Sequence, residues 1–119
     1  MKEPNVTWRV FTIYMFVLLF MLFAGIVKSQ IVVTHFNAAW NEPNKVSYIG
    51  KLTDCKIVYV DIAVSPKLQA KHEIVVVPTV VIFKDGEEAL RFQADLSFKM
   101  VATRKEVQEA IDELLMSDF

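Results

Sequence analysis

The residues capable of chemistry in this sequence are few: one cysteine, Cys55, and two histidines, His35 and His72. A single thiol cannot close an intramolecular disulfide, form a Cys-x-x-Cys redox pair or supply a cysteine-based zinc site. Neither histidine has an acidic or sulfur neighbour at ligand spacing, so we expect no metal site. Three glycines without a G-x-G-x-x-G or Walker pattern offer no phosphate-binding loop. These residues therefore point away from dithiol, metal and nucleotide chemistry, and we expect no cofactor.

The overall composition is that of one apolar, folded unit. The chain has 119 residues, of which 54% are hydrophobic and 23% charged. This excludes a disordered or collagen-like chain and leaves room for a single domain. Thirteen Lys and Arg against fourteen Asp and Glu give a net charge of -1, so we expect no nucleic-acid partner.

The apolar residues are concentrated in one uncharged run, Val10 to Val27. As a helix, with a rise of about 1.5 Å per residue, it would span roughly 27 Å, close to the ~30 Å hydrocarbon core of a bilayer. A buried core helix fits poorly because the remaining chain is too small to surround one. A cleaved signal peptide is a further alternative, although its apolar region usually has about 7–15 residues. We therefore predict an N-terminal tail (1–9), a transmembrane helix (10–28) and a folded domain (29–119).

The folded domain alternates strand and helix patterns. Four mainly apolar runs are typical of strands, namely Gln30–Phe36, Lys56–Ile62, Thr79–Lys84 and Glu87–Phe92, the last two joined by an Asp85-Gly86 turn. Nearly continuous apolar strands indicate a sheet covered on both faces. Three helices are predicted: one beginning at Asn41-Glu42-Pro43 with Val46, Ile49 and Leu52 on its inner face, one from Ser65-Pro66 to about His72, and an amphipathic one after the Thr103–Glu106 capping box.

This order resembles the thioredoxin family from Ile31 to Leu115, about seven-tenths of the chain. The stretch VVTHFNAAW, ending at Trp40, is similar to the family's first central strand and leading tryptophan. The stretch Asn41–Lys45 (NEPNK) stands where the family carries Cys-Gly-Pro-Cys-Lys, and Val77-Pro78-Thr79 resembles its cis-proline loop. The resemblance implies a truncated thioredoxin-like α/β fold, β-α-β-α-β-β-α around a central mixed sheet. One transmembrane helix would precede it, in place of the family's first strand and helix.

The resemblance also implies that the family's chemistry is lost. Thiol–disulfide exchange needs a thiolate that attacks and a second sulfur that resolves the mixed disulfide, and the amides of Asn41 and Asn44 can do neither. His35 stands where the family has a buried acid, and Gln93 or Ala94 where a glycine borders its groove. We therefore expect no catalytic residue and no enzyme activity. The expected site is a degenerate active-site motif (Trp40, Asn41, Glu42, Pro43 and Asn44) beside a retained cis-proline loop (Val77, Pro78 and Thr79).

The lone thiol and the histidines have structural interpretations as well. Cys55 precedes the second strand, at the far end of the domain from the motif in this topology, so we interpret it as a partly buried structural residue. A monothiol oxidoreductase using Cys55 remains an alternative. His35 is interpreted as a hydrogen-bonded core residue and His72 as a helix-end residue.

These observations together predict a redox-inactive, membrane-anchored thioredoxin-like protein. It would act as a structural, accessory or assembly subunit of a larger membrane complex, such as a respiratory one. Its expected partners are the lipid bilayer and the other subunits, with no small-molecule substrate. The expected location is a single-pass position in a membrane such as the mitochondrial inner membrane. The alternative is a membrane-tethered chaperone or substrate-binding module that grips clients through Trp40 and Pro78.

Overall fold

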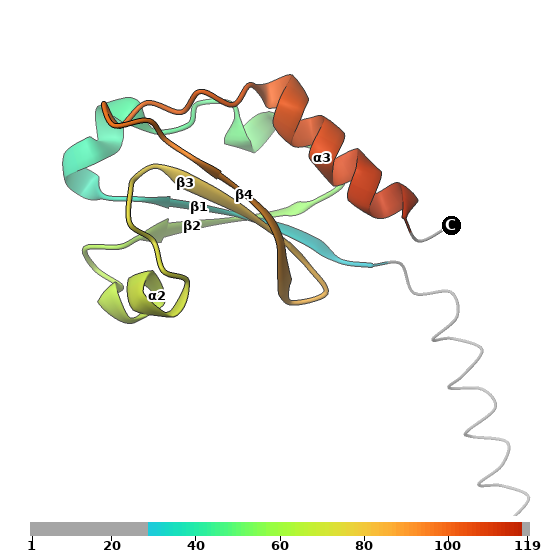
Figure 1. Ribbon diagram of the computed structural model, residues 1–119, viewed down its shortest axis with the longest axis horizontal. Coiled ribbons are helices and arrows are strands. Elements are labelled where there is room, and N and C mark those ends of the chain that lie inside the picture. Colours follow the sequence, from blue (N-terminus) through green and yellow to red (C-terminus); the bar gives the residue numbers. More distant parts are fainter. Residues whose placement is uncertain (1–28, 118–119) are drawn as a thin grey trace, which may run out of the picture.

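The structure, a computed structural model, describes residues 29–117. The predicted tail and transmembrane helix, residues 1–28, lie outside this range. Among the described residues no helix is both long and apolar enough to cross a membrane. The elements in chain order are β1 (Ile31–Asn37), the 3-10 turns η1 (Ala39–Asn44) and η2 (Ile49–Lys51), β2 (Lys56–Asp61), α2 (Pro66–Lys71), β3 (Thr79–Lys84), β4 (Glu87–Gln93) and α3 (Arg104–Met116) (Figure 1).

The four strands form one mixed sheet in the order β2-β1-β3-β4. Strand β1 pairs in parallel with β2 and antiparallel with β3, and β3 pairs antiparallel with β4. Asn37 lies opposite Asp61, and Phe36 lies opposite Thr79. The C-terminal ends of β1 and β2 therefore lie beside the start of β3, at one end of the sheet. This arrangement confirms the central mixed sheet expected from the sequence.

The sheet is covered on both faces, as its nearly continuous apolar strands predicted (Figure 1). Helix α3 and the segment 39–52 cover one face, and α2 with the chain that follows it covers the other. The first face buries Ile31, Val33, Val46, Ile49, Leu52, Val80, Ile82, Val107 and Ile111. The second, smaller cluster contains Phe36, Ile74, Val77 and Val81. Burial on both faces fixes the register of β1 and β3, because a slip by one residue would exchange the two clusters.

The first predicted helix is wrong, since the segment after β1 forms two short 3-10 turns instead. Asn41 has φ -108° and ψ 18°, outside the helical region, and Lys45 is extended with ψ 153°. The Asn41 and Asn44 side chains hydrogen-bond locally, which competes with helix formation. The predicted inner positions Val46, Ile49 and Leu52 are nevertheless buried. The apolar spacing identified the core side chains but not the backbone that carries them.

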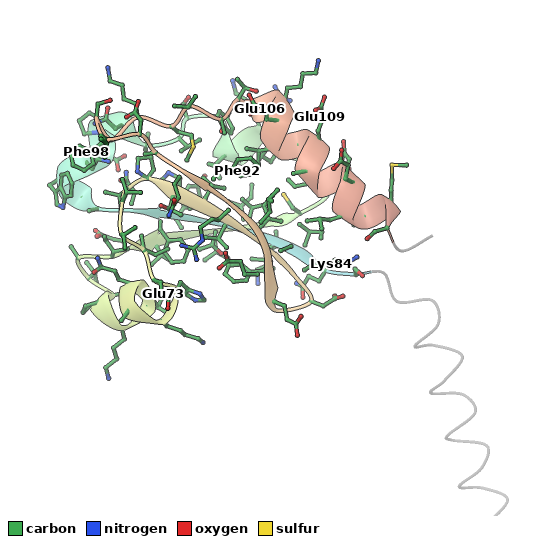
Figure 2. All side chains as sticks on the ribbon, in the orientation of Figure 1. Glu73, Lys84, Phe92, Phe98, Glu106 and Glu109 are labelled. Carbon is green, nitrogen blue, oxygen red and sulfur yellow. The ribbon has the colours of Figure 1, made fainter. Side chains whose placement is uncertain are left out.

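Helix α3 begins as its capping box predicts. The Thr103 hydroxyl accepts a hydrogen bond from the Glu106 backbone N–H at 3.2 Å. At its other end the Lys84 ammonium donates to the Leu114 carbonyl at 3.0 Å and to the Ser117 hydroxyl at 2.8 Å. Figure 2 shows Lys84 and Glu106 near opposite ends of this helix. Strand β3 and helix α3 are thereby joined by polar contacts beyond their shared core.

Candidate functional site

The sequence motifs predicted to form the site meet at the end of the sheet where β1 ends and β3 begins. We call this region the motif corner, and it comprises residues 39–45, 76–79 and 94–99. The Ala94 N–H donates to the Pro78 carbonyl at 3.0 Å, which joins the chain after β4 to the loop before β3. Trp40 contacts Phe98 with ring centroids 5.4 Å apart. The structure therefore brings the degenerate motif and the cis-proline loop together, and adds the segment 94–99, of which the sequence analysis had singled out only its start at Gln93 or Ala94.

The centre of the motif corner is a network of asparagine amides. Asn41 is 3% exposed, and its Nδ2 donates to the Asn37 Oδ1 at 3.0 Å and to the Val77 carbonyl at 3.3 Å. The Asn41 Oδ1 accepts from the Asn44 Nδ2 at 2.9 Å, and the Asn37 Nδ2 donates to the Asn41 carbonyl at 3.2 Å. Both hydrogens and the oxygen of the Asn41 amide are thus used. The network links the motif to the cis-proline loop without any group that could act as a nucleophile.

The cis-proline loop is held from both sides. The Val77–Pro78 peptide bond is cis, and Val77, Pro78 and Thr79 are all buried. The Thr79 hydroxyl donates to the Val76 carbonyl at 2.6 Å. Since the Val77 carbonyl is bonded to Asn41 and the Pro78 carbonyl to Ala94, the backbone acceptors of this loop have internal partners.

The outer surface of the motif corner carries three exposed apolar side chains, Trp40, Leu96 and Phe98, which we call the apolar rim. Trp40 is 64% exposed and meets the edge of the Phe98 ring at an interplanar angle of 87°. Leu96, which lies in the chain between β4 and Phe98, is 99% exposed. Glu42 and Pro43 are also exposed, and Glu42 pairs with Lys45 at 3.1 Å. The predicted motif residues therefore divide into a buried Asn41 with a half-buried Asn44, and an exposed set of Trp40, Glu42 and Pro43.

A tight turn presents the apolar rim. The Asp95 carboxylate accepts from the Ser97 N–H at 2.8 Å and from the Lys99 N–H at 3.1 Å. The Phe98 N–H donates to the Asp95 carbonyl at 3.0 Å, and Phe98 has φ 66°, a conformation that bulky residues rarely adopt. The hydrogen bonds of Ser97 and Lys99 keep the pKa of Asp95 low, so this carboxylate stays ionised at neutral pH. Figure 2 shows Phe98 projecting at this end of the molecule.

His35 is a buried, hydrogen-bonded residue, as interpreted from the sequence. Its Nε2 accepts the Val46 N–H at 3.1 Å, and Tyr59 lies edge-on to its ring at 5.6 Å. Burial lowers the pKa of His35, so the ring is neutral at pH 7. His35 also lines a cavity of about 590 Å³ with Tyr59, Asp61, Lys45 and Gly50. His35 therefore helps to hold the backbone of segment 39–52 in place through its bond to Val46.

Cys55 lies away from the motif corner. It immediately precedes β2, whose first residue pairs with Val32, near the opposite end of β1 from Asn37. Its side chain packs against the larger core cluster, and burial raises the pKa of the thiol. A raised pKa lowers the thiolate fraction at neutral pH. Among residues 29–117 no three His, Cys, Asp or Glu side chains converge to hold a metal ion.

Comparison with solved structures finds thioredoxins. A mutant thioredoxin from Halobacterium salinarum matches at a TM-score of 0.57 and 22% identity, covering 72% of this chain and 75% of that one. Thioredoxin 1 from Thermosipho africanus matches at 0.55 and 22%, covering 73% and 97%. The Fasciola hepatica thioredoxin matches at 0.53 and 22%, covering 81% and 89%. The fold is thioredoxin-like. No family model and no curated protein matches the chain.

Two features of the motif corner were missed from the sequence. Asn37 belongs to the amide network although only Asn41 and Asn44 were singled out. The Asp95–Lys99 turn was not identified either. Its signal was Asp95 itself, because an Asp side chain often accepts from the backbone N–H two residues further on, here that of Ser97.

Proposed function

We propose that the chain is a redox-inactive thioredoxin-like protein that serves as an accessory or assembly subunit of a larger membrane complex. Residues 10–27 would anchor it in the membrane, with single-pass topology. Only three residues, Lys28 to Gln30, separate this run from β1, so the domain would be held at the membrane face. An energy-transducing membrane such as the mitochondrial inner membrane is the proposed location.

The buried amide network is the observation that carries the loss of redox activity. Asn41 and Asn44 stand where the resemblance places the reactive cysteines, and their side chains are bonded to each other and, through Asn41, to the Val77 carbonyl. These bonds join the two motif positions to each other and to the cis-proline loop without a thiol. A monothiol role for Cys55 has less support, because its pKa is raised and it lies a strand's length from the motif corner.

The apolar rim of the motif corner supports a docking role. Leu96 and Phe98 expose apolar surface on a turn that several hydrogen bonds hold in place, and the exposed Trp40 ring packs against Phe98. Exposed apolar patches of this kind mark interaction sites more often than isolated apolar residues do. A fixed patch on an anchored domain is what an accessory subunit would present to its neighbour.

The proposal is tested by extracting the full chain from its membrane in mild detergent and measuring the mass of the complex that retains it. We expect stable incorporation at a fixed stoichiometry, weakened by Leu96→Glu but not by Met116→Glu. Met116 is a matched control because it is 69% exposed and lies at the end of α3, away from the motif corner. Extraction of the chain as a free protein, or equal effects of the two variants, would contradict the proposal.

A membrane-tethered chaperone or substrate-binding module is a second candidate, favoured by the full exposure of Leu96, two residues from the Phe98 ring that contacts Trp40. Crosslinks from Trp40 would then reach many client proteins in changing proportions, whereas the subunit role predicts one constant neighbour.

Exchanging Val10–Val27 for an unrelated span of equal length should preserve membrane insertion and weaken incorporation if the span also contacts the complex.

A further inference from the structure

His35 joins strand β1 to the segment 39–52 through a bond that one proton would break. The ring is 4% exposed, and its Nε2 accepts the Val46 N–H at 3.1 Å. Because Nε2 is the acceptor, the proton of the neutral ring lies on Nδ1. A protonated imidazole donates from both nitrogens, so it cannot accept the Val46 N–H in either ring orientation. The bond to Val46 and a second proton on His35 therefore exclude each other.

Residues 42–47 depend on this bond for their polar attachment to the sheet. The stretch is flanked by Asn41, which is bonded to the cis-proline loop, and by Tyr48, whose hydroxyl donates to a carbonyl just before α3. Between them, within the part of the chain that the structure describes, only the Val46 N–H forms a hydrogen bond with another element. The Val46 side chain is buried, but both of its neighbours in the chain are exposed. A stretch attached mainly by one buried side chain and one hydrogen bond can open locally at a low cost in free energy.

The groups around the His35 ring favour its charged form only outside the closed structure. Four charged or titratable side chains line the cavity of about 590 Å³ beside the ring, namely Glu42 and Lys45 from the stretch 42–47 and Tyr59 and Asp61 from β2. On the β3 side the residue opposite His35 is the apolar Val80. Burial is the main cause that lowers the pKa of His35, while Glu42 opposes this effect and Lys45 adds to it. A ring that turned into the cavity would exchange burial for water and for two nearby carboxylates.

We propose that protonation of His35 releases residues 42–47 from the sheet while the rest of the domain stays folded. A proton from solvent takes the Nε2 lone pair that the Val46 N–H had used, and the Val46 N–H then bonds to water. In the released state the ring is solvated, so it binds the proton more tightly than in the closed state, with a pKa near the unfolded value of about 6.5. As the pH falls below about 6.5, the ratio of released to closed molecules should rise by up to about tenfold per pH unit.

The released stretch lies next to the apolar rim. Residues 43–48 line a cavity of about 250 Å³ together with Lys99 and Met100, which follow Phe98 in the chain. Release would move one wall of this cavity and change the surface beside Phe98. The docking surface would thereby become sensitive to pH, a consequence that rests on the proposed function. The release itself involves only the described domain and requires neither a membrane anchor nor a partner.

Amide hydrogen exchange of the full chain in mild detergent tests the release. The quantity compared is the protection factor, which corrects each exchange rate for the intrinsic rate at the same pH. Between about pH 7.5 and pH 5.5 the protection of the Val46 amide should fall about five- to tenfold. Val81, buried in β3 between two strands, reports global unfolding and should stay more strongly protected than Val46 at every pH. Equal protection of the two amides would mean that Val46 exchanges only when the whole domain unfolds, which would overturn the proposal.

Two matched variants separate His35 from the other titrating groups. His35→Gln keeps a side-chain acceptor, because the glutamine Oε1 can take the place of Nε2, but it binds no proton in this pH range. The protection of Val46 should then change less than about twofold. His72→Gln changes the histidine on the other face of the sheet, beside Phe36, and should respond as the wild type does. A fall in His35→Gln as large as that in the wild type would overturn the proposal.

NMR titration of the wild type provides a check that needs no variant. The ring signals of His35 and the amide signal of Val46 should change with one common midpoint, below about pH 6.5. A Val46 amide that keeps its hydrogen-bonded chemical shift after His35 is protonated would contradict the release.

Discussion

Replacing Asn41 by alanine should destabilise the protein more than the same change at Asn44, its neighbour in the amide network. The Asn41 amide donates to two buried acceptors, Asn37 Oδ1 and the Val77 carbonyl, and accepts from Asn44. Truncation leaves both acceptors buried without a donor. A buried polar group that loses its partner costs about 1–3 kcal/mol. Because some water or side-chain movement will compensate, we expect a total loss of about 2–4 kcal/mol.

Thermal unfolding followed by circular dichroism measures this loss. For a domain of this size, 1 kcal/mol corresponds to a shift of about 4–8 °C in the midpoint. Asn41→Ala should therefore lower the midpoint by at least about 8 °C. Asn44→Ala is the matched control, because Asn44 is half-buried and gives up one hydrogen bond, with an expected cost of about 0.5–1.5 kcal/mol.

Asn41→Asp provides a sharper test of the same bonds. An ionised carboxylate accepts hydrogen bonds only, so it would face the Asn37 Oδ1 and Val77 carbonyl oxygens with no proton to offer. Its destabilisation should be largest at neutral pH and smaller in acid, where a protonated carboxyl can donate once. If Asn41→Ala lies within about 0.5 kcal/mol of the wild type, which is the effect of an ordinary surface substitution, the network does not hold the motif corner together.

Three further predictions concern other parts of the fold. Burial holds the pKa of His35 below its unfolded value of about 6.5, so the unfolded chain takes up the proton first as the pH falls. The free energy of unfolding in urea should therefore decrease as the pH drops through about 6.5, and His35→Gln should show a smaller decrease. The Tyr48 hydroxyl donates to the Ala102 carbonyl at 2.6 Å, and burial raises the pKa of Tyr48 to about 12. Absorbance titration should therefore show one tyrosine ionising late, and the free energy of unfolding should decline above about pH 10, the pKa of an unfolded tyrosine. Thr103→Ala removes the cap of α3 and should cost about 1 kcal/mol in denaturant unfolding, whereas Thr103→Ser should cost little.

The parts of the fold that follow local rules could be predicted from the sequence. Strand β3 has the predicted bounds, Thr79–Lys84, because a mainly apolar and β-branched run ends at an Asp-Gly turn. Helix α3 begins directly after the capping threonine. Both signals act within a few residues, where backbone and side-chain preferences decide the structure.

The parts that depend on distant contacts could not be predicted in this way. Asn41 bonds to Val77, 36 residues further along the chain, and this bond helps to draw the segment after β1 out of a helix. The Val46 N–H bonds to the His35 ring rather than to a helical carbonyl. The apolar positions 46, 49 and 52 would be buried in a helix or in turns, so their spacing could not distinguish the two.

The proposed loss of thiol–disulfide exchange is tested most directly by the reduction of insulin disulfides in the presence of dithiothreitol. The full chain should give no more turnover than dithiothreitol alone, because Asn41 and Asn44, where the sequence resemblance places the reactive cysteines, carry amides bonded to each other. Asn41→Cys combined with Asn44→Cys serves as the positive comparison, although His35 in place of the family's acid predicts a slow rate. Catalysed turnover by the wild type that disappears in Cys55→Ser would contradict the proposed loss of redox function.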